Sequence, residues 1–345
     1  MLEPASLTGD FEYYLGRVHH FSAYPPPVDD HLNKLVNTLR NVLSGGMRSA
    51  APPTAPGPPT DDDLVALGRA ISYDIREELS KVAVEGDAEV LSERRPGQTV
   101  NVIDLVCNRQ ARQTIASWQR RGHTIRLVGE DIAAAVAPST GEDIVVCLDS
   151  LDGTQHWLRG RNLYCTAMSI FAKGNGGAYR LRASLVHHSN GMLFVAREDR
   201  SAAYIDGQTE PLRAHSTGSS TLAGAHVCTM ARRPGHYQAL LPLLEGGSPF
   251  SGMYLFGGNP VLVELPLARY DALFQPDAAI FNDSQDLWDW LPGIHVAYRS
   301  GCTVLNGHGH PVDVPAIADA SFASGLSRFS YVVAGSEALA RSLTA

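Results

Sequence analysis

The chain has 345 residues, of which 28 are basic and 36 are acidic, so its formal net charge is −8. This balance argues against a general nucleic-acid or anionic-membrane binder, and no window approaches the ~18 apolar residues of a membrane-spanning helix. The first thirty residues lack an uninterrupted apolar run, so we expect no secretory signal. Five widely spaced cysteines without a C-x-x-C pair are typical of free thiols in a reducing cytoplasm.

The chain is long enough for two domains or one large α/β unit. Residues 1–50 are expected to form an extension with one amphipathic helix, and the half-proline stretch 51–60 predicts a stiff linker. Residues 61–206 are expected to form an α+β half, and residues 207–345 a smaller α/β half. Predicted helices cover 61–82, 104–121, 235–244, 260–269 and 289–300, and predicted strands cover 125–128, 144–148, 164–172, 180–187, 192–196, 202–205, 223–229 and 272–274.

A continuous apolar run, Ile144 to Leu148, predicts a strand that is buried on both faces. Asp149 and Asp152 follow at its end. Two carboxylates delivered to one point by a buried strand are costly unless a cation or dense hydrogen bonding compensates them. The alternative is an ordinary turn in which aspartate forms the turn and caps a helix.

Three further acidic positions fit this pair. Glu130 follows the short strand at 125–128, and Asp104 begins the second helix. Asp289 precedes a helix in which Pro292 is expected within the first turn, where its missing N–H costs little. Asp289 taken alone is equally explained as a helix cap.

Three short motifs in this order resemble those of a known family. Gly129-Glu130-Asp131, the run DSLDGT at 149–154 and Trp288-Asp289 resemble the G-E-E, D-P-[ILV]-D-G-T and W-D motifs of the inositol monophosphatase family. This family belongs to the lithium-sensitive, magnesium-dependent phosphatases, which include fructose-1,6-bisphosphatase. The resemblance extends over about residues 61–335. It implies an α/β fold, a layered α-β-α-β-α sandwich of the sugar/inositol phosphatase type, in a protein that is usually a homodimer.

The resemblance also implies two magnesium ions per site, with a weaker third. Their ligands would be Glu130, Asp149, the carbonyl of Leu151, Asp152 and Asp289. Magnesium prefers carboxylate oxygen and shares the substrate phosphate, and two such ions can activate water for in-line displacement.

Catalysis would then depend on Thr154 and Asp104. The threonine hydroxyl, with the aspartate behind it, would accept and relay the proton of the attacking water. Gly153 and Thr154 would offer backbone N–H groups to the phosphate.

Several positions depart from the family pattern. Ser150 replaces the proline, and Asp131 replaces the second glutamate. Asp271 to Gln275 resembles the family's D-A-x-x-E, so Gln275 stands where a substrate-binding glutamate is expected. The segment from Pro276 to Asp286 looks long, and its acids Asp277, Asp283 and Asp286 are candidates for substrate contact.

Weaker signals have two interpretations each. His187-His188 and His308/His310 could bind zinc, although paired histidines in a strand face opposite sides. Arg159 and Arg161 could meet a second phosphate or lie in a solvated loop. Asn259, after Gly257-Gly258, could border the substrate or belong to a simple turn.

We therefore expect a magnesium-dependent phosphomonoesterase that acts on a small sugar, cyclitol or nucleoside phosphate by metal-activated water. A narrower alternative is a phosphatase for a 3′-phosphonucleotide or a sugar bisphosphate. An alternative of another class is a non-catalytic protein that keeps the fold and binds a phosphorylated ligand. The expected partner is a small phosphorylated metabolite, without nucleic acid or membrane.

Overall fold

The fold is taken from a computed structural model. It is described for residues 57–82, 90–95, 98–130, 132, 141–174, 176–200, 203–206, 212–214, 216, 218–230, 238, 240–241, 251–267, 275–324 and 329–344. All of these belong to the unit that spans residues 55–345. The predicted helix at 29–43, most of the linker, Asp131, the strand at 272–274 and most of the helix at 235–244 lie outside the described residues.

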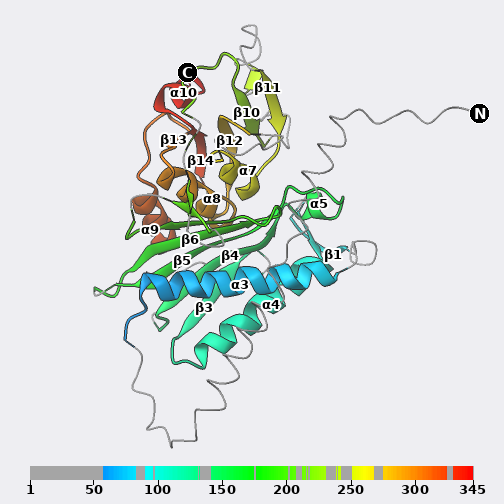
Figure 1. The fold of residues 1–345 in the computed structure, drawn as a ribbon, viewed down its shortest axis with the longest axis vertical. Coiled ribbons are helices and arrows are strands. Elements are labelled where there is room, and N and C mark those ends of the chain that lie inside the picture. The colour runs from blue at the N-terminus through cyan, green and yellow to red at the C-terminus, as the bar shows by residue number, and fades with distance from the viewer. Residues whose placement is uncertain are drawn as a thin grey trace, which may run out of the picture. The chain divides into compact units, whose positions relative to one another are not determined.

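A seven-stranded sheet organises the first half (Figure 1). Its strands, in sheet order, are β3 (Ile125–Gly129), β4 (Ile144–Asp152), β5 (Cys165–Lys173), β6 (Tyr179–His188), β7 (Leu193–Arg197), β8 (Tyr204–Ile205) and β9 (Leu212–Arg213). β3 and β4 run parallel, and the remaining neighbours run antiparallel. A separate hairpin joins β1 (Val90–Arg95) to β2 (Gln98–Asn101). The predicted strands at 125–128, 144–148, 164–172, 180–187 and 192–196 are all present in this sheet.

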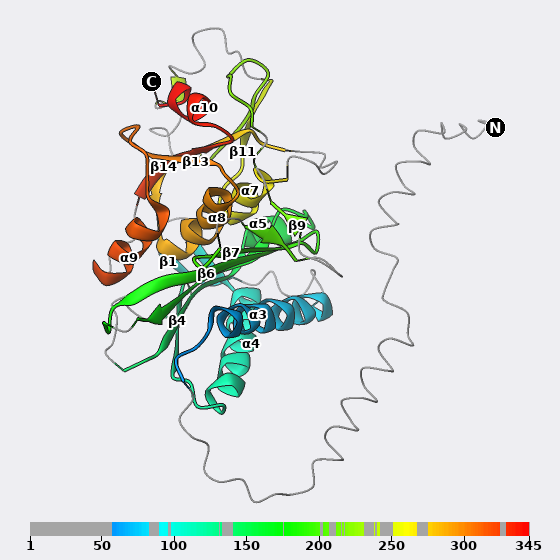
Figure 2. The ribbon, with the colours of Figure 1, turned by 60° about the vertical axis from the view of Figure 1, so that its left-hand side comes forward.

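Two helices cover one face of this sheet, α3 (Asp61–Lys81) and α4 (Val102–Gln119) (Figure 2). α3 starts at a capping box in which the Thr60 hydroxyl accepts from the backbone N–H of Asp63 at 3.2 Å. α4 begins two residues before the predicted position, so Asp104 is its third residue. Side chains of β4 alternate: Ile144, Val146 and Leu148 pack toward these helices, whereas Val145 and Cys147 pack on the opposite face. β4 is therefore buried on both faces, as predicted.

The opposite face carries a middle helical layer and then a second sheet (Figure 2). The helices are α7 (Asn259–Glu264), α8 (Leu287–Arg299) and α9 (Val314–Ser324). The five strands, in sheet order, are β11 (Gly252–Leu255), β10 (His226–Thr229), β12 (Ala278–Gln285), β14 (Phe329–Ala334) and β13 (Thr303–Asn306). α10 (Glu337–Ser342) covers the outer face of that sheet. The layers therefore follow the order α-β-α-β-α, and the predicted sandwich is confirmed.

The predicted start of α8 is wrong. The helix begins at Leu287, so Pro292 is its sixth residue and not part of a first turn. A proline there removes the N–H that would bond to the carbonyl of Trp288. That carbonyl instead accepts a hydrogen bond from Nδ2 of Asn259 at 3.2 Å. A side chain from another helix thus makes an interior proline tolerable.

The segment before α8 also differs from expectation. Residues predicted as an unusually long link form β12, which pairs with β10 and β14. The predicted helix at 260–269 is the shorter α7. Among the described residues, no helix combines the length and the apolar character needed to cross a membrane.

Candidate active site and metal centre

Three elements bring three acidic side chains to one point. Because β3 and β4 are parallel and Gly129 pairs with Leu148, Glu130 and Asp149 leave the same edge of the sheet. The first turn of α8 adds Asp289. One carboxylate oxygen from each of these three residues lies within 4.8 Å of the others. We call Glu130, Asp149 and Asp289 the acidic cluster.

The acidic cluster concentrates negative charge in a poorly solvated place. Burial, followed by the charges of Asp152, Glu130 and Asp289, raises the pKa of Asp149 well above its usual range. Burial, with the charges of Glu130 and Asp152, likewise raises the pKa of Asp289. Like charges this close repel one another strongly where water is excluded. A bound divalent cation would remove this cost.

Asp152 borders the acidic cluster and is held by its own partners. Its Oδ2 accepts hydrogen bonds from the backbone N–H and from Nδ2 of Asn259, at 2.6 and 3.1 Å. A Cβ at Gly258 would contact both carboxylate oxygens of Asp152, so glycine permits this close approach. The charge of Asp152 is felt by both Asp149 and Asp289.

Thr154 and Asp104 meet as predicted. Thr154 lies in α5 (Thr154–Trp157), and its Oγ1 is 3.0 Å from Oδ1 of Asp104 and 2.8 Å from the carbonyl oxygen of Leu151. The other oxygen of Asp104 accepts from the backbone N–H and Nδ2 of Asn101. Burial raises the pKa of Asp104, which these hydrogen bonds partly oppose. The carbonyl of Leu151 therefore faces the same small region as the Thr154 hydroxyl.

Gly153 forms the turn that precedes Thr154 and orients its side chain toward Asp104. Its φ is 87°, and a Cβ there would lie 2.7 Å from the carbonyl oxygen of Leu163. A side chain at this position would therefore be strained and crowded. Phosphate binding by the N–H groups of Gly153 and Thr154 stays a prediction.

The three predicted substrate-binding residues, Asp286, Asn259 and Gln275, lie in different positions relative to the acidic cluster. Asp286 is the N-cap of α8, and its backbone N–H donates to Oδ2 of Asp289 at 3.1 Å. Asn259 is fully buried with its amide bonded inside the protein, which does not favour substrate contact. Gln275 precedes β12, whereas the acidic cluster lies beyond the other end of that strand. Eight strand residues separate these ends by about 26 Å, so Gln275 is not brought to the cluster.

A second Asp-Ala pair explains the misplacement of Gln275. Asp277-Ala278 starts the strand that leads into α8, and the fifth residue counted from Asp277 is the buried Phe281. At the far end of β12, Gln285 accepts a hydrogen bond from Tyr331 at 3.2 Å. Burial, and then the charges of Asp289 and Asp152, raise the pKa of Tyr331, so this pair lies beside the site. Neither Gln285 nor Tyr331 was predicted from the sequence, because neither stands in a recognised motif.

The weaker signals lie outside the acidic cluster. His187 packs edge-on against Tyr73, and Nε2 of His188 is 3.0 Å from Glu264. Among the described residues, neither histidine pair joins a group with metal-ligand spacing. Arg159 and Arg161 are exposed.

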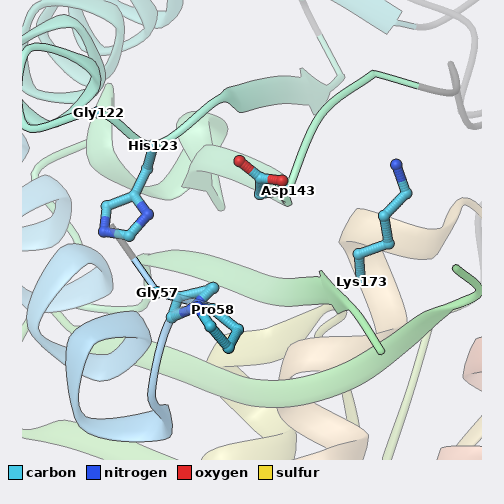
Figure 3. A pocket seen from close by; sticks show the side chains of 7 residues that line it. Gly57, Pro58, Gly122, His123, Asp143 and Lys173 are labelled. Atoms are coloured by element: carbon cyan, nitrogen blue, oxygen red, sulfur yellow. The ribbon is translucent and has the colours of Figure 1, made fainter. Parts of the chain in front are cut away.

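A surface pocket of about 370 Å³ lies elsewhere (Figure 3). Its lining includes His123 and Asp143, which precede β3 and β4, and Lys173 at the end of β5. The acidic cluster lies toward the opposite ends of β3 and β4, so this pocket is not the candidate active site.

The layered sandwich defines the class: the chain has the fold of the inositol monophosphatases. It resembles the extragenic suppressor protein SuhB from Bartonella henselae, with a TM-score of 0.62 and 16% identity over 81% of this chain and 96% of that one. It also resembles an IMPase from Thermotoga maritima, with a TM-score of 0.61 and 12% identity over 83% and 96%. A calcium-bound IMPase family protein from Staphylococcus aureus gives a TM-score of 0.61 and 16% identity over 83% and 95%. No protein-family model and no curated protein matches the sequence.

Proposed function

We propose that this protein is a magnesium-dependent phosphomonoesterase. The observation that carries the proposal is the acidic cluster, in which carboxylates from β3, β4 and α8 converge although burial and mutual repulsion oppose their ionisation. Bringing ionised carboxylates together in this way destabilises the fold unless a bound cation compensates their charge. Solved structures with the same fold include an IMPase/NADP phosphatase in complex with Mg²⁺ and phosphate.

The donor set fits magnesium. Oxygen ligands from Glu130, Asp149 and Asp289, with Asp152 and the Leu151 carbonyl nearby, match the preference of this hard cation. Magnesium held there would neutralise phosphate charge and lower the pKa of water. Two ions, with a weaker third, follow the family pattern.

The chain's own contribution to proton transfer is the pair of Thr154 and Asp104. The hydroxyl is held between Oδ1 of Asp104 and the Leu151 carbonyl oxygen, two acceptors that compete for its single proton. When Thr154 gives its proton to Asp104, its oxygen can accept one from an attacking water. Asn101 fixes the carboxylate for this role.

We infer a small phosphorylated metabolite as the substrate: a sugar, cyclitol or nucleoside phosphate. Structures with this fold hold inositol monophosphate, 2′-AMP and NADP. A 3′-phosphonucleotide or sugar bisphosphate is the narrower candidate. A homodimer and lithium inhibition stay predictions based on the family resemblance. The five free, buried cysteines support a location in a reducing compartment such as the cytoplasm.

The proposal is tested by phosphate release from a panel of sugar, inositol and nucleotide phosphates, with Mg²⁺ and with EDTA. Release is expected with Mg²⁺ and should stop with EDTA. Asp149→Asn should lower the turnover number by more than the ~10- to 100-fold typical of changing a group that only orients a metal ligand, because Asp149 is itself a proposed ligand. It should also raise the melting temperature in EDTA, because a neutral amide relieves the repulsion among buried carboxylates.

The matched control is Asp319→Asn on α9, whose carboxylate accepts from the backbone N–H of Leu181 at 2.7 Å outside the acidic cluster. Its turnover should remain that of the wild type. Unchanged turnover in Asp149→Asn would contradict the proposal. Tight binding of a phosphorylated ligand without any release would favour the non-catalytic alternative.

A further inference from the structure

Asn259 lies where three elements meet. From the start of α7 it donates to Asp152 at the end of β4, through its backbone N–H at 2.6 Å and Nδ2 at 3.1 Å. Nδ2 also lies 3.2 Å from the carbonyl oxygen of Trp288 in α8, and Oδ1 accepts from the N–H of Gly293 at 2.7 Å. The residue is 0% exposed. One side chain thus bonds to both a site carboxylate and the backbone of α8.

On α8, Asn259 repairs a specific defect. Pro292 cannot supply the N–H that the Trp288 carbonyl would accept in a regular helix. A carbonyl left without a donor inside the protein is destabilising, and Nδ2 of Asn259 supplies the donor that the Trp288 carbonyl lacks. α7 and α8 pack closely at this point, because a Cβ at Gly293 would lie 2.9 Å from Oδ1 of Asn259 and 2.7 Å from the Cβ of Leu262. The side-chain amide of Asn259 therefore links α7 to the backbone of α8.

At Asp152, the same amide supplies donors to a carboxylate with acidic neighbours. Both donors of Asn259 reach the same oxygen, Oδ2, so they restrict how the carboxylate can turn. Because α8 also carries Asp289 in its first turn, one amide relates the position of Asp152 to that of Asp289.

We propose that Asn259 is a positioning residue. By bonding to both Asp152 and the backbone of α8, it fixes where Asp152 lies relative to Asp289, and so sets the affinity of the acidic cluster for a divalent cation. The inference rests on the proposed function in one respect, because it takes this cluster to bind such a cation. It does not require that a particular phosphate ester be hydrolysed.

The test is the affinity for Mn²⁺, used as the probe ion and measured by electron paramagnetic resonance, alongside the melting temperature. Asn259→Ala should weaken Mn²⁺ binding about 10- to 100-fold, the usual effect of removing a group that orients a metal ligand. It should also lower the melting temperature, because the Trp288 carbonyl loses its donor.

Pro292→Ala separates these two effects. An alanine at 292 supplies the N–H that the Trp288 carbonyl needs, but it cannot donate to Asp152. Adding Pro292→Ala to Asn259→Ala should therefore recover much of the melting temperature and leave Mn²⁺ binding weak. If Asn259→Ala alone does not fold, the double variant is compared with Pro292→Ala alone, which keeps Asn259.

Asn306→Ala is the matched control. Oδ1 of Asn306 accepts from the N–H groups of His308 and His310 within one turn, outside the acidic cluster. Its Mn²⁺ affinity should remain that of the wild type. Equal Mn²⁺ affinity with and without the Asn259 side chain, or recovery of that affinity by Pro292→Ala, would overturn the inference alone. A wild-type protein that binds no Mn²⁺ would overturn the proposed function as well.

Discussion

At the scale of single residues, the Thr154 hydroxyl has the most sharply defined of the proposed roles, because two acceptors hold it. Thr154→Val preserves the shape of the side chain but removes its proton. We expect a loss of about 10²- to 10⁴-fold in kcat, the usual contribution of general acid–base catalysis, with Mn²⁺ affinity unchanged. Thr154→Ser should retain most activity. Steady-state kinetics with Mg²⁺ measure both effects.

Thr114→Val controls for the loss of a threonine-to-aspartate hydrogen bond. Thr114 donates to Oδ2 of Asp74 at 2.6 Å within the helical layer of α3 and α4. That variant should lose stability and keep its kcat. Equal losses of kcat in the two valine variants would remove the special role of Thr154.

The residue scale also shows where sequence reasoning reaches its limit. Asp149, Asp289 and Thr154 were predictable as neighbours because each stands in a recognisable motif, and Asp104 was placed with them by the family resemblance. Gln275 was misplaced because Asp-Ala occurs twice, at 271–272 and 277–278, and a sequence does not reveal which copy starts a strand.

At the scale of elements, the parallel contact between β3 and β4 determines where Glu130 lies. A Cβ at Gly129 would collide with the carbonyl oxygen of Leu148 on β4, where the backbone cannot yield cheaply. Gly129→Ala should destabilise the protein by about 1–3 kcal/mol, as overpacking commonly does, and should weaken Mn²⁺ binding by displacing Glu130. Urea unfolding and metal titration measure the two effects.

Gly141→Ala is the corresponding control, because a Cβ there meets nothing within 4 Å. Its free energy of unfolding and Mn²⁺ affinity should be close to those of the wild type. If both alanine variants behave alike, the contact between Gly129 and Leu148 does not position Glu130.

Elements with strong local signals were predicted well. The apolar run of β4 and the helix α3, which begins at Asp61 as predicted, both depend on neighbouring residues. The start of α8 was not predictable in the same way. Pro292 suggested a first turn, but Asn259, 33 positions earlier, makes an interior proline tolerable. A compensation between distant residues leaves no local pattern.

At the scale of the whole molecule, buried histidines lie on both faces of the seven-stranded sheet. His187 on β6 packs against Tyr73 of α3, and burial, followed by the charge of Arg76, lowers its pKa to about 4. His295 on α8 bonds to Ser184 of β6 from the other side, and burial lowers its pKa as well. On both faces of the sheet, the buried histidine is therefore favoured in its neutral form.

Stability should consequently fall in mild acid. An unfolded histidine binds a proton near pH 6.5 and folded His187 only near pH 4, so protonation favours the unfolded state between these values. The stabilisation is fully present above pH 6.5, and up to about 3 kcal/mol is lost as the pH falls through 4. Urea unfolding from pH 7.5 to 4 measures this slope.

His187→Gln should flatten the slope, whereas His308→Gln, in an exposed turn, should leave it unchanged. An unaltered slope in His187→Gln would show that another group causes the loss of stability in acid.

The position of α8 has a consequence for synthesis on the ribosome. Asp289 follows Asp149 by some 140 residues, which take roughly 7–28 s to translate at typical rates. The hairpins from β5 to β7 can pair during that interval, but the apolar face that α8 later covers is still open to water. A cation at the proposed metal centre could not assist this early stage, because the acidic cluster is not yet assembled. The nascent first half therefore depends on its own packing, or on a chaperone, until the last third of the chain emerges.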